Sequence, residues 1–443
     1  DIVTVEVLKD PSSTAIYGSR GANGVILVTT KRGKTGESRI DYNVDVSVPS
    51  VGPNFPKVLN AKEFLAVEDL AYKNMEKYDP AGWAAGKYVT RNPALARKDP
   101  RLFDSSGNPY FDTDWLKEAT QNKLSQNHEL GFSGGNERTT YAFSVGHRND
   151  QGLIKTSFLK RYSGRSSIDD QVKPWLKVGG TLSYTNQNEN LVDQSDQVAR
   201  SIVEDFPFLP VKYSNGFYAD NRDYPNAEGR FNVVHRLYDT KFLLGTQTTL
   251  GSMYSNIKFA EGLEMKTIIG ANIISQENNE YSGSTLNISD QGYAAGRTRK
   301  EAFWSIENFL TYNKRFNENH SITGLLGISW QKSNFNNISS EVRGFATDYF
   351  EFNNLGAGSR NPQVGSNKSS QALNSYFGRI NYSLKDKYLF TATGRADGSS
   401  KFGENNKYAF FPSAAIAWRV SEENFLKDSR IISNLKLRSS IGV

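Results

Sequence analysis

Residues 388–397 read YLFTATGRAD and residues 408–420 read YAFFPSAAIAWRV, and these two stretches decide the fold class. The first alternates between apolar or small residues at even positions and mainly polar residues at odd positions. The second has an apolar residue at every even position from Tyr408 to Val420. Because successive side chains of a β-strand point to opposite faces, each stretch predicts a strand with one continuous apolar face.

The same alternation recurs along the chain and predicts thirteen β-strands. Most of these segments contain ten or more residues, whereas a strand of a soluble sheet has about five or six. A tilted strand that crosses a membrane needs roughly 9–11 residues, so the lengths favour a membrane-spanning sheet. The predicted strands cover residues 38–48, 122–134, 138–149, 157–168, 175–187, 243–258, 262–275, 300–315, 321–333, 371–384, 388–398, 408–420 and 434–443.

The connections between these strands differ strongly in length. The longest cover residues 49–121, 188–242, 276–299 and 334–370. Tight turns are expected at residues 134–137, 169–174, 317–320 and 385–387. This arrangement predicts an all-β, antiparallel up-and-down sheet with two unequal rims. In transmembrane β-barrels the short turns lie in the periplasm and the long loops lie outside the cell.

Composition excludes several other classes of protein. The 443-residue chain has no cysteine, which rules out disulfide scaffolds, Cys-based metal sites and thiol catalysis. No run of 18 apolar residues occurs, so a membrane-spanning helix is excluded. Lys and Arg total 53 against 47 Asp and Glu, and this dilute net charge of +6 predicts no nucleic-acid partner. A soluble β-sandwich or propeller is the alternative, but sandwich strands are shorter and no propeller repeat is present.

The first 33 residues break the barrel pattern. Residues 3–7 alternate as a strand, and the apolar segment at residues 25–28 predicts a second one. Between them lies YGSRGANG, residues 17–24, whose glycines invite comparison with a phosphate-binding loop. The spacing is GxxGxxG, no Lys-Ser/Thr follows, and the next element is a strand, so a compact glycine turn is favoured.

Several long segments together resemble the SusC/RagA family of TonB-dependent outer-membrane transporters. VEVLKDPSSTAIYGSRGANGVILVTTKRGKTG, residues 5–36, resembles the end of the family's plug domain. Residues 113–154, from TDWLKEAT to NDQGLI, resemble its second and third barrel strands. SYFGRINYSLKDKYLFTATGRADGSSKFGENNKYAFFPSAAIAWRVSEENFL, residues 375–426, resembles its mid-barrel segment, and LKLRSSIGV, residues 435–443, resembles the strand that follows.

The resemblance implies a division of the chain into two parts. Residues 1–36 would be the C-terminal end of the plug, and residues 37–443 the N-terminal part of a barrel of about 22 strands. The first strand would then lie against a part of the barrel beyond this sequence. The resemblance assigns the plug motif to Asp10, Tyr17, Gly18, Arg20, Gly21, Asn23 and Gly24.

The function implied by the resemblance is active import of an oligosaccharide or a peptide across the bacterial outer membrane. The implied partners are a SusD-like surface lipoprotein, the TonB–ExbB–ExbD complex, membrane lipid and lipopolysaccharide, and a second transporter–lipoprotein pair as a dimer. The alternative is a structural or receptor component of a larger outer-membrane assembly. Neither the import function nor the structural or receptor function requires a cofactor, and neither is enzymatic. A third hypothesis, an outer-membrane enzyme barrel, would need a catalytic arrangement of residues that the sequence lacks.

Aromatic residues in the long connections are the candidate ligand contacts. Rings interleaved with polar residues suit sugars and peptides, although the same rings could pack the loops together or contact the lipoprotein. The candidates are Trp83, Tyr110, Trp115, Phe217 and Tyr218. The residues expected in the aromatic girdles are Trp175, Tyr184, Trp304, Trp330 and Trp418.

Charged residues give weaker predictions. Cations on the polar strand faces should point into the lumen, where they line a path or pair with plug carboxylates. These cations are Lys177, Arg379, Arg395, Arg419 and Arg438. His128, His147, His235 and His320 are scattered among expected polar strand, loop and turn positions without a catalytic arrangement. Paired acidic residues such as 169–170, 193–196 and 422–423 offer oxygens for a structural calcium ion, but solvated turns are favoured.

Overall fold

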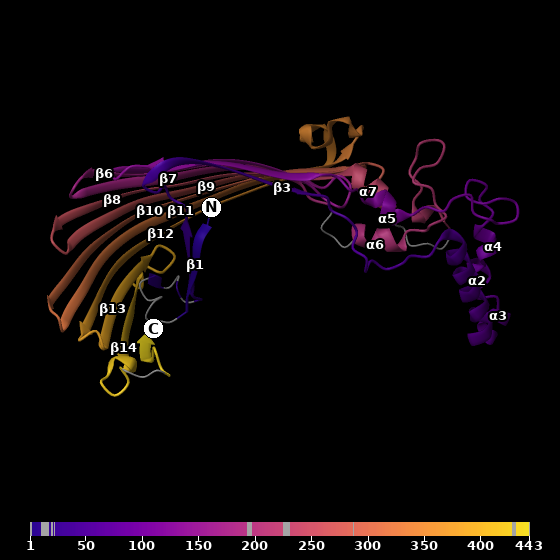
Figure 1. Ribbon diagram of the computed structural model, residues 1–443. Coiled ribbons are helices and arrows are strands. Elements are labelled where there is room, and N and C mark those ends of the chain that lie inside the picture. The colour runs from indigo at the N-terminus through magenta and orange to yellow at the C-terminus, as the bar shows by residue number, and fades with distance from the viewer. Residues whose placement is uncertain are drawn as a thin grey trace.

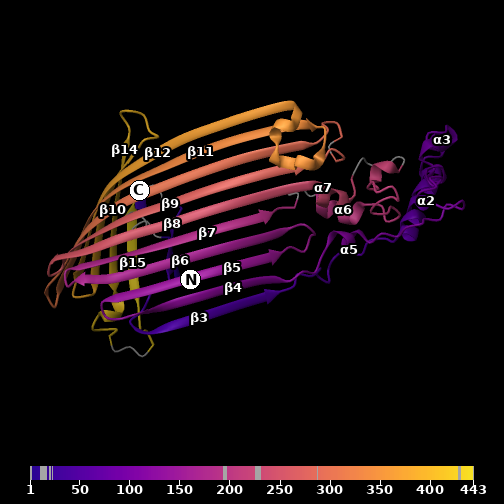
Figure 2. The ribbon, with the colours of Figure 1, turned by 90° about the horizontal axis from the view of Figure 1, so that it is seen from above.

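The computed structural model describes residues 2–9, 17–18, 21, 23–192, 197–224, 231–286, 288–427 and 431–442. Its main body is one antiparallel sheet of thirteen strands that curves into an open trough (Figures 1 and 2). A second, two-stranded sheet lies on the concave side of the trough, and a layer of short helices lies beyond one end of it (Figure 1).

All thirteen predicted strands are present and follow one another in chain order. The strands are β3 Gly36–Ser47, β4 Ser125–Gly135, β5 Thr139–Gln151, β6 Phe158–Lys173, β7 Leu176–Asn190, β8 Thr240–Ala260, β9 Leu263–Ser282, β10 Tyr293–Asn317, β11 His320–Phe345, β12 Gly358–Leu384, β13 Tyr388–Ser399, β14 Tyr408–Arg419 and β15 Lys436–Gly442. Each strand pairs with the next, so β3 and β15 occupy opposite edges of the sheet. The predicted up-and-down meander is therefore confirmed.

The extents of several strands differ from the prediction, and those of β9 to β12 differ most. β6 also continues to Lys173, through most of the turn expected at residues 169–174. β9 continues to Ser282 and β10 begins at Tyr293, so most of the expected loop 276–299 is strand. Likewise β11 continues to Phe345 and β12 begins at Gly358, which leaves a short connection where residues 334–370 were expected to form a loop. These extensions lack a regular apolar alternation, although Ala294 and Val342 belong to a small buried cluster. Their ladders nevertheless continue, for example from Ser333 to Glu341 against β12.

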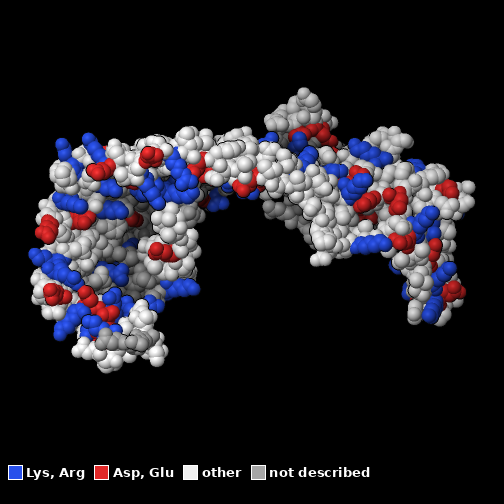
Figure 3. Space-filling model, viewed as in Figure 1, with Lys and Arg blue, Asp and Glu red and all other residues white. Residues whose placement is uncertain are grey.

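The two faces of the curved sheet differ as the alternation predicts. Val44, Ile269 and Ile416 are 50%, 52% and 58% exposed, as expected for an outer wall that faces lipid. Figure 3 shows charged side chains gathered towards the turn end and over the helical layer, with few across the middle of the visible sheet. Of the expected girdle residues, Trp175, Tyr184, Trp304 and Trp330 are exposed, and Trp418 is half-buried. Trp304 and Trp330 lie in mid-strand, because β10 and β11 extend beyond the apolar segment.

Two long connections contain helices, although the sequence pattern predicted only loops there. Asn60 caps the first helix by accepting a hydrogen bond from the Glu63 amide, and Glu63 accepts one from the Asn60 amide in return. The helices are α2 Ala61–Tyr78, α3 Pro80–Ala84, α4 Pro93–Ala96, α5 Trp115–Ala119, α6 Gln197–Glu204 and α7 Val233–Asp239. The 3-10 turns are η2 Val89–Arg91, η3 Asn221–Asp223, η4 Asp348–Asn353, η5 Leu355–Ala357 and η6 Val420–Glu422. No helix among the described residues is long and apolar enough to cross a membrane.

These helices share one apolar core, which we call the loop layer. Residues from the β3–β4 and β7–β8 connections contribute to it, including the fully buried Leu102, Phe103 and Phe208. The rings of Phe103 and Phe208 lie 5.4 Å apart between centroids. Burial of these aromatic surfaces joins two connections that are far apart in sequence and makes them one rigid unit.

The small sheet consists of β1 Ile2–Leu8 and β2 Val25–Thr30, and both strands were predicted. They pair antiparallel, with Val5 opposite Val28. We call the described residues between 2 and 35 the N-terminal segment. Figure 1 places β1 inside the curve of the main sheet, where the segment can reach the polar face of the wall.

Candidate functional site

The N-terminal segment meets the concave face of the sheet at two separate places. One contact is made by the tip at Gly18 against β13, and we call it the Gly18 contact. The other is made by Arg32 against β6 and β8, and we call it the Arg32 contact. Between them the segment bridges the interior of the trough, so both contacts would have to change if the segment moved.

The Gly18 contact depends on the absence of a side chain. Gly18 has φ +60°, a left-handed conformation that glycine adopts readily. A Cβ atom built there would lie 2.1 Å from Asp397 Oδ2 and 2.4 Å from Arg395 Nε. Both the backbone conformation and the space therefore require glycine, which gives a structural reason for this glycine in the turn.

Beneath Gly18 lies a buried ion pair on β13. Arg395 Nε donates to Asp397 Oδ1 at 2.6 Å, and the two side chains are only 2% and 4% exposed. Arg395 Nη2 also donates to Ser375 Oγ on β12 at 2.9 Å, and the guanidinium lies 5.0 Å from the Phe377 ring centroid. Such a pair is stable only when its remaining hydrogen-bonding groups are satisfied, so the whole cluster holds one geometry. Arg395 was predicted to line the lumen or pair with a plug carboxylate; among the described residues it pairs with a carboxylate on its own strand.

The Arg32 contact joins the end of the N-terminal segment to two wall strands. Arg32 Nη1 lies 2.7 Å from Asp169 Oδ1, and the guanidinium is 5.4 Å from the Tyr254 ring centroid. Tyr254 Oη donates to the same Asp169 oxygen at 2.6 Å. Nearby, Arg165 Nη2 donates to Thr30 Oγ1 at 2.6 Å. Asp169 thus accepts from the segment and from β8 at once.

The space around the Arg32 contact is lined by charged groups together with apolar side chains such as Phe132 and Phe143. A pocket of about 520 Å³ lies between the N-terminal segment and strands β3 to β6. Lys31 and Arg32 line one side, and Asp41 and Glu129 line the other. Because charged groups stand on both surfaces, water can replace their polar contacts at little cost if the segment separates from the wall.

The predicted plug motif is only partly described. Gly24 has φ +93° and its amide donates to the Gly21 carbonyl at 2.9 Å, which closes the glycine turn. Gly21 is buried and Asn23 is exposed, while Tyr17 precedes the tip glycine. Asp10 and Arg20 lie outside the described residues. Strand alternation places Lys177, Arg379, Arg419 and Arg438 on the concave face with Arg395.

The five candidate ligand-contacting aromatics lie in or beside the loop layer. Phe217 and Tyr110 are 66% and 57% exposed, whereas Trp115 is 2% exposed. The Trp115 indole N–H donates to the Phe206 carbonyl at 3.0 Å, so it holds the loop layer together in this conformation. Trp83 packs on Tyr72 with ring centroids 4.9 Å apart. Among the described residues no ring contact joins any two of the five, and their role in ligand binding stays a prediction.

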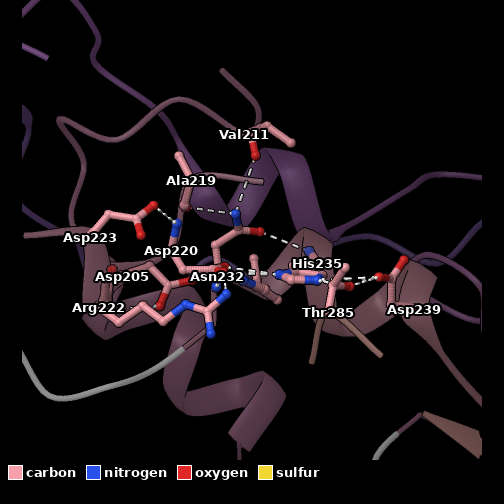
Figure 4. A network of polar contacts seen from close by, with 12 residues as sticks. Asp205, Val211, Ala219, Asp220, Arg222, Asp223, Asn232, His235, Asp239 and Thr285 are labelled. Atoms are coloured by element: carbon pink, nitrogen blue, oxygen red, sulfur yellow. Dashed lines mark hydrogen bonds and ion pairs between the residues drawn. The ribbon is translucent and has the colours of Figure 1, made fainter. Parts of the chain in front are cut away.

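Tyr218 contacts a buried polar network that the sequence did not predict (Figure 4). Its ring stacks on His235, with centroids 4.2 Å apart. His235 was expected to be a polar strand or turn residue, but it lies on α7 and is 2% exposed. No local pattern distinguishes it, because Tyr218 and Asp220 in one segment and Thr285 in another meet it only in the tertiary structure, although Asp239 lies four residues along the same helix.

The network centres on Asp220 and His235. His235 Nδ1 lies 3.1 Å from Asp220 Oδ1, and His235 Nε2 lies 2.9 Å from Thr285 Oγ1 and 3.2 Å from Asp239 Oδ2. Asp220 also accepts from the Asn232 amide at 2.9 Å. Because Thr285 belongs to the β9–β10 connection, the network ties a third loop to the loop layer.

Burial and charge shift the pKa values in this network. Burial lowers the pKa of His235, but hydrogen bonds with Asp220 and Asp239 outweigh that effect and hold the pKa above its usual value. Burial raises the pKa of Asp205 to about 8, although the Val233 amide donates to its carboxylate at 2.8 Å. The folded loop layer therefore favours a charged His235 and a neutral Asp205. Among the described residues no group of three or more acidic or His side chains could hold a metal ion, and the predicted acidic pair at 193–196 lies outside them.

Known proteins resemble the chain along its whole length. It is 32% identical over 452 residues to TonB-dependent receptor P26 of Formosa agariphila, a match that covers all of this chain and 43% of the receptor. It is 34% identical to TonB-dependent receptor P3 of the same organism, with 42% of that receptor covered. TonB-dependent receptor SusC of Bacteroides thetaiotaomicron is 28% identical, with 43% covered. No family model matches the chain.

The fold is also that of a solved structure. The RagAB peptide transporter superposes with a TM-score of 0.80 at 24% identity, over all of this chain and 51% of the transporter chain. The thirteen-stranded sheet is therefore part of the barrel of an outer-membrane TonB-dependent receptor, a class of receptors and not of enzymes. Within that class the chain belongs to the SusC/RagA family. It spans about two fifths of the length of the curated relatives that it matches.

Proposed function

We propose that this chain is part of an importer that carries an oligosaccharide or a peptide across the outer membrane. In this proposal residues 1–36 are the C-terminal end of the plug and residues 37–443 are barrel. The energy comes from the TonB–ExbB–ExbD complex, which pulls on the plug, because the outer membrane itself has no nucleotide supply. The peptide alternative agrees with the name of the RagAB transporter, whose fold this chain shares.

The observation that carries the proposal is the polar attachment of the N-terminal segment to the wall. The Arg32 contact and the Gly18 contact consist of ion pairs, hydrogen bonds and a close backbone approach. A segment held by such contacts can leave the wall without exposing a large apolar surface. Mechanical work can therefore release it, and it can dock again when the pull ends.

The loop layer is the proposed place of capture. It lies beyond the end of the sheet opposite the tight turns, where an importer would receive cargo from outside (Figures 1 and 2). The exposed rings of Phe217 and Tyr110 and the half-buried Trp83 and Tyr218 are available for stacking on sugars or peptide side chains. A SusD-like lipoprotein would cover this layer, and two such pairs would form a dimer.

A crosslink between the N-terminal segment and the wall tests the proposal. Thr30→Cys with Arg165→Cys replaces a hydrogen-bonded pair, and this chain contains no other cysteine. A short reducible bis-thiosulfonate reagent is applied to cells that carry the whole protein, and uptake of fluorescent oligosaccharides and peptides is measured. We expect uptake to stop on crosslinking and to return on reduction.

The matched control places both cysteines in the wall. Ser144→Cys with Arg165→Cys joins directly paired positions of β5 and β6 and leaves the N-terminal segment free. Uptake should survive this crosslink and the reagent on each single variant. If the Thr30–Arg165 crosslink forms and uptake continues, the segment does not need to move, and the receptor or structural alternative is favoured.

A further inference from the structure

The outer face of strands β4 to β6 carries a row of rings on directly paired positions, and β3 continues the row with a valine. Val44, His128, His147 and Tyr162 occupy directly paired positions on the four strands. The rings of His128 and His147 lie 6.5 Å apart and nearly parallel, and those of His147 and Tyr162 lie 4.8 Å apart. Tyr42 Oη lies 2.7 Å from His128 Nδ1 and extends the row to the neighbouring level.

This row marks a change of polarity on the outer face. On the side of the tight turns the next outward residues are apolar, and they include Leu130, Val145 and Phe143. On the side of the long connections the next outward residues of β4 to β6 are Gln126, Asn149 and Lys160, whereas β3 keeps an apolar residue there, Val46. A border of rings between an apolar band and polar side chains is the pattern of a membrane–water interface. Because the long connections face outwards, the border lies at the outer leaflet.

The charges at this border have one sign. Lys160 is exposed and stands opposite Asn149, on the same strand face as Tyr162. The outward positions from residue 40 to 46, 126 to 132, 143 to 149 and 158 to 168 are all described, and none carries a carboxylate. Neither imidazole nitrogen of His147 has a hydrogen-bond partner among the described residues. The border therefore presents unopposed donors.

Below the donors the surface leaves room for a hydrocarbon chain. The outward position after Tyr162 is Gly164, where an added Cβ would meet no atom within 4 Å. Its paired neighbours are Val145 and Tyr184, which are 56% and 45% exposed. A low strip between taller apolar side chains suits an acyl chain that descends from a headgroup held above it.

We propose that His147, Lys160 and Tyr162 bind the phosphorylated headgroup of an outer-leaflet lipid, with an acyl chain lying over Gly164. Charge complementarity commits this surface to a phosphate-bearing lipid, since its donors are cationic or neutral and no carboxylate lies among them. The site is on the lipid-facing wall, so it is independent of import and of the Arg32 and Gly18 contacts.

Lipid retention by the whole purified protein in detergent tests the proposal. The probes are bisphosphorylated lipid A and the same lipid after removal of both phosphates, and bound lipid is counted by native mass spectrometry. His147→Gln with Lys160→Gln should lower the affinity for bisphosphorylated lipid A about tenfold. The dephosphorylated lipid should bind weakly and equally to both proteins. Resistance of the barrel to heat in a gel-shift assay shows that the variant is folded.

Lys300→Gln is the matched control. Lys300 is an exposed lysine on β10 in the same row of paired residues, but its direct neighbours are Ser275 and Asn336 and not rings. This variant should retain lipid A as the unaltered protein does. Equal retention by the double variant would overturn the proposal, as would equal binding of the dephosphorylated lipid. Full displacement by millimolar inorganic phosphate would show a site for free anions instead.

Discussion

Gly18 lies so close to Asp397 that a single added carbon would stand 2.1 Å from the Asp397 carboxylate oxygen. The two residues are 379 positions apart in sequence, the difference between their numbers. Each belongs to a separate segment that resembles the family, the glycine turn of residues 17–24 and the strand end at residues 397–400. The structure joins the two, because the turn docks on the buried Arg395–Asp397 pair.

Gly18→Ala should loosen the N-terminal segment. The left-handed backbone costs an alanine about 1–2 kcal/mol, and the added carbon would also displace Arg395 or Asp397. We expect faster hydrogen exchange in β2, measured by mass spectrometry on the whole protein. Gly52→Ala is the control, since a Cβ there meets no atom within 4 Å. Unchanged exchange in Gly18→Ala would show that the tip does not hold the segment.

Arg32→Ala should weaken the attachment of the N-terminal segment to the wall at the other end of the segment. A hydrogen bond to a charged group contributes about 1.5–3 kcal/mol, and we expect about 1 kcal/mol here because Arg32 is 45% exposed and solvent screens the pair. The free energy of local opening of β2 is measured by hydrogen exchange at low and high salt. The difference between variant and unaltered protein should shrink at high salt.

Arg39→Ala provides the comparison for Arg32. Arg39 is also exposed and paired, but its partner Asp41 lies on the same strand, 2.6 Å away. Its loss should leave β2 exchange unchanged. An equal effect of the two variants would mean that general charge, and not the Arg32–Asp169 pair, attaches the segment.

The loop layer should be most stable at mildly acidic pH. A raised pKa of His235 means that its contribution is complete below the usual value of 6.5 and is lost as pH rises through the folded value. Asp205, with its pKa raised from 3.8 to about 8, contributes stability that is complete below pH 3.8 and is lost as pH rises to about 8. Asp239 acts oppositely: its pKa is lowered despite burial, through hydrogen bonds from His235 and Thr285, so its contribution is lost only in strong acid.

Hydrogen exchange of α7 measures this pH dependence after correction for intrinsic rates. Protection should fall as pH rises from about 4 to about 8, with His235 contributing above pH 6.5, while α2, which lies outside the network, should change little. His235→Gln should flatten the part of the profile that belongs to the histidine. If α7 protection rises over this range in the unaltered protein, the assignment of a charged His235 and a neutral Asp205 is wrong.

Variants of Trp115 and Phe217 should distinguish a role in loop packing from a role in ligand contact. Trp115→Phe leaves the Phe206 carbonyl without its indole donor, which costs about 1–3 kcal/mol in the loop layer. Phe217→Ala removes a ring that is 66% exposed and should cost little. Thermal unfolding and equilibrium binding of candidate oligosaccharides and peptides are measured for both. A ligand role for Phe217 predicts lower affinity at unchanged stability, and unchanged affinity for every cargo that the protein imports would exclude that role.

Ile269→Lys should impair insertion of the barrel. Ile269 lies on the outer face, where a lysine near the centre of the bilayer costs about 2–4 kcal/mol. Ile268→Lys is the control at the next residue of β9, whose side chain points to the concave face. The amount of folded protein in outer-membrane fractions should fall for the first variant and remain near normal for the second. The reverse result would assign the faces of the sheet the other way round.

The number and order of the strands, and the face of the sheet that each side chain occupies, could be predicted because each depends on the local alternation of apolar and polar residues. Alternation such as that from Tyr408 to Val420 reports directly which face meets lipid, since a one-residue change of register would turn apolar side chains inwards. The extensions of β9 to β12 could not be predicted in this way. They lack a regular apolar alternation, and only pairing with neighbouring strands shows that they continue as sheet.

What the sequence determined by itself was the wall: an apolar outer face, a polar inner face, and glycines where a turn needs them. What only the tertiary structure decided was which distant groups meet, namely Gly18 with Asp397, Arg32 with Asp169, and His235 with Asp220 and Thr285. The physical reason is the range of the interactions. Strand alternation is fixed within a few residues, whereas a buried ion pair or histidine is stable only when chain segments from elsewhere supply its partners.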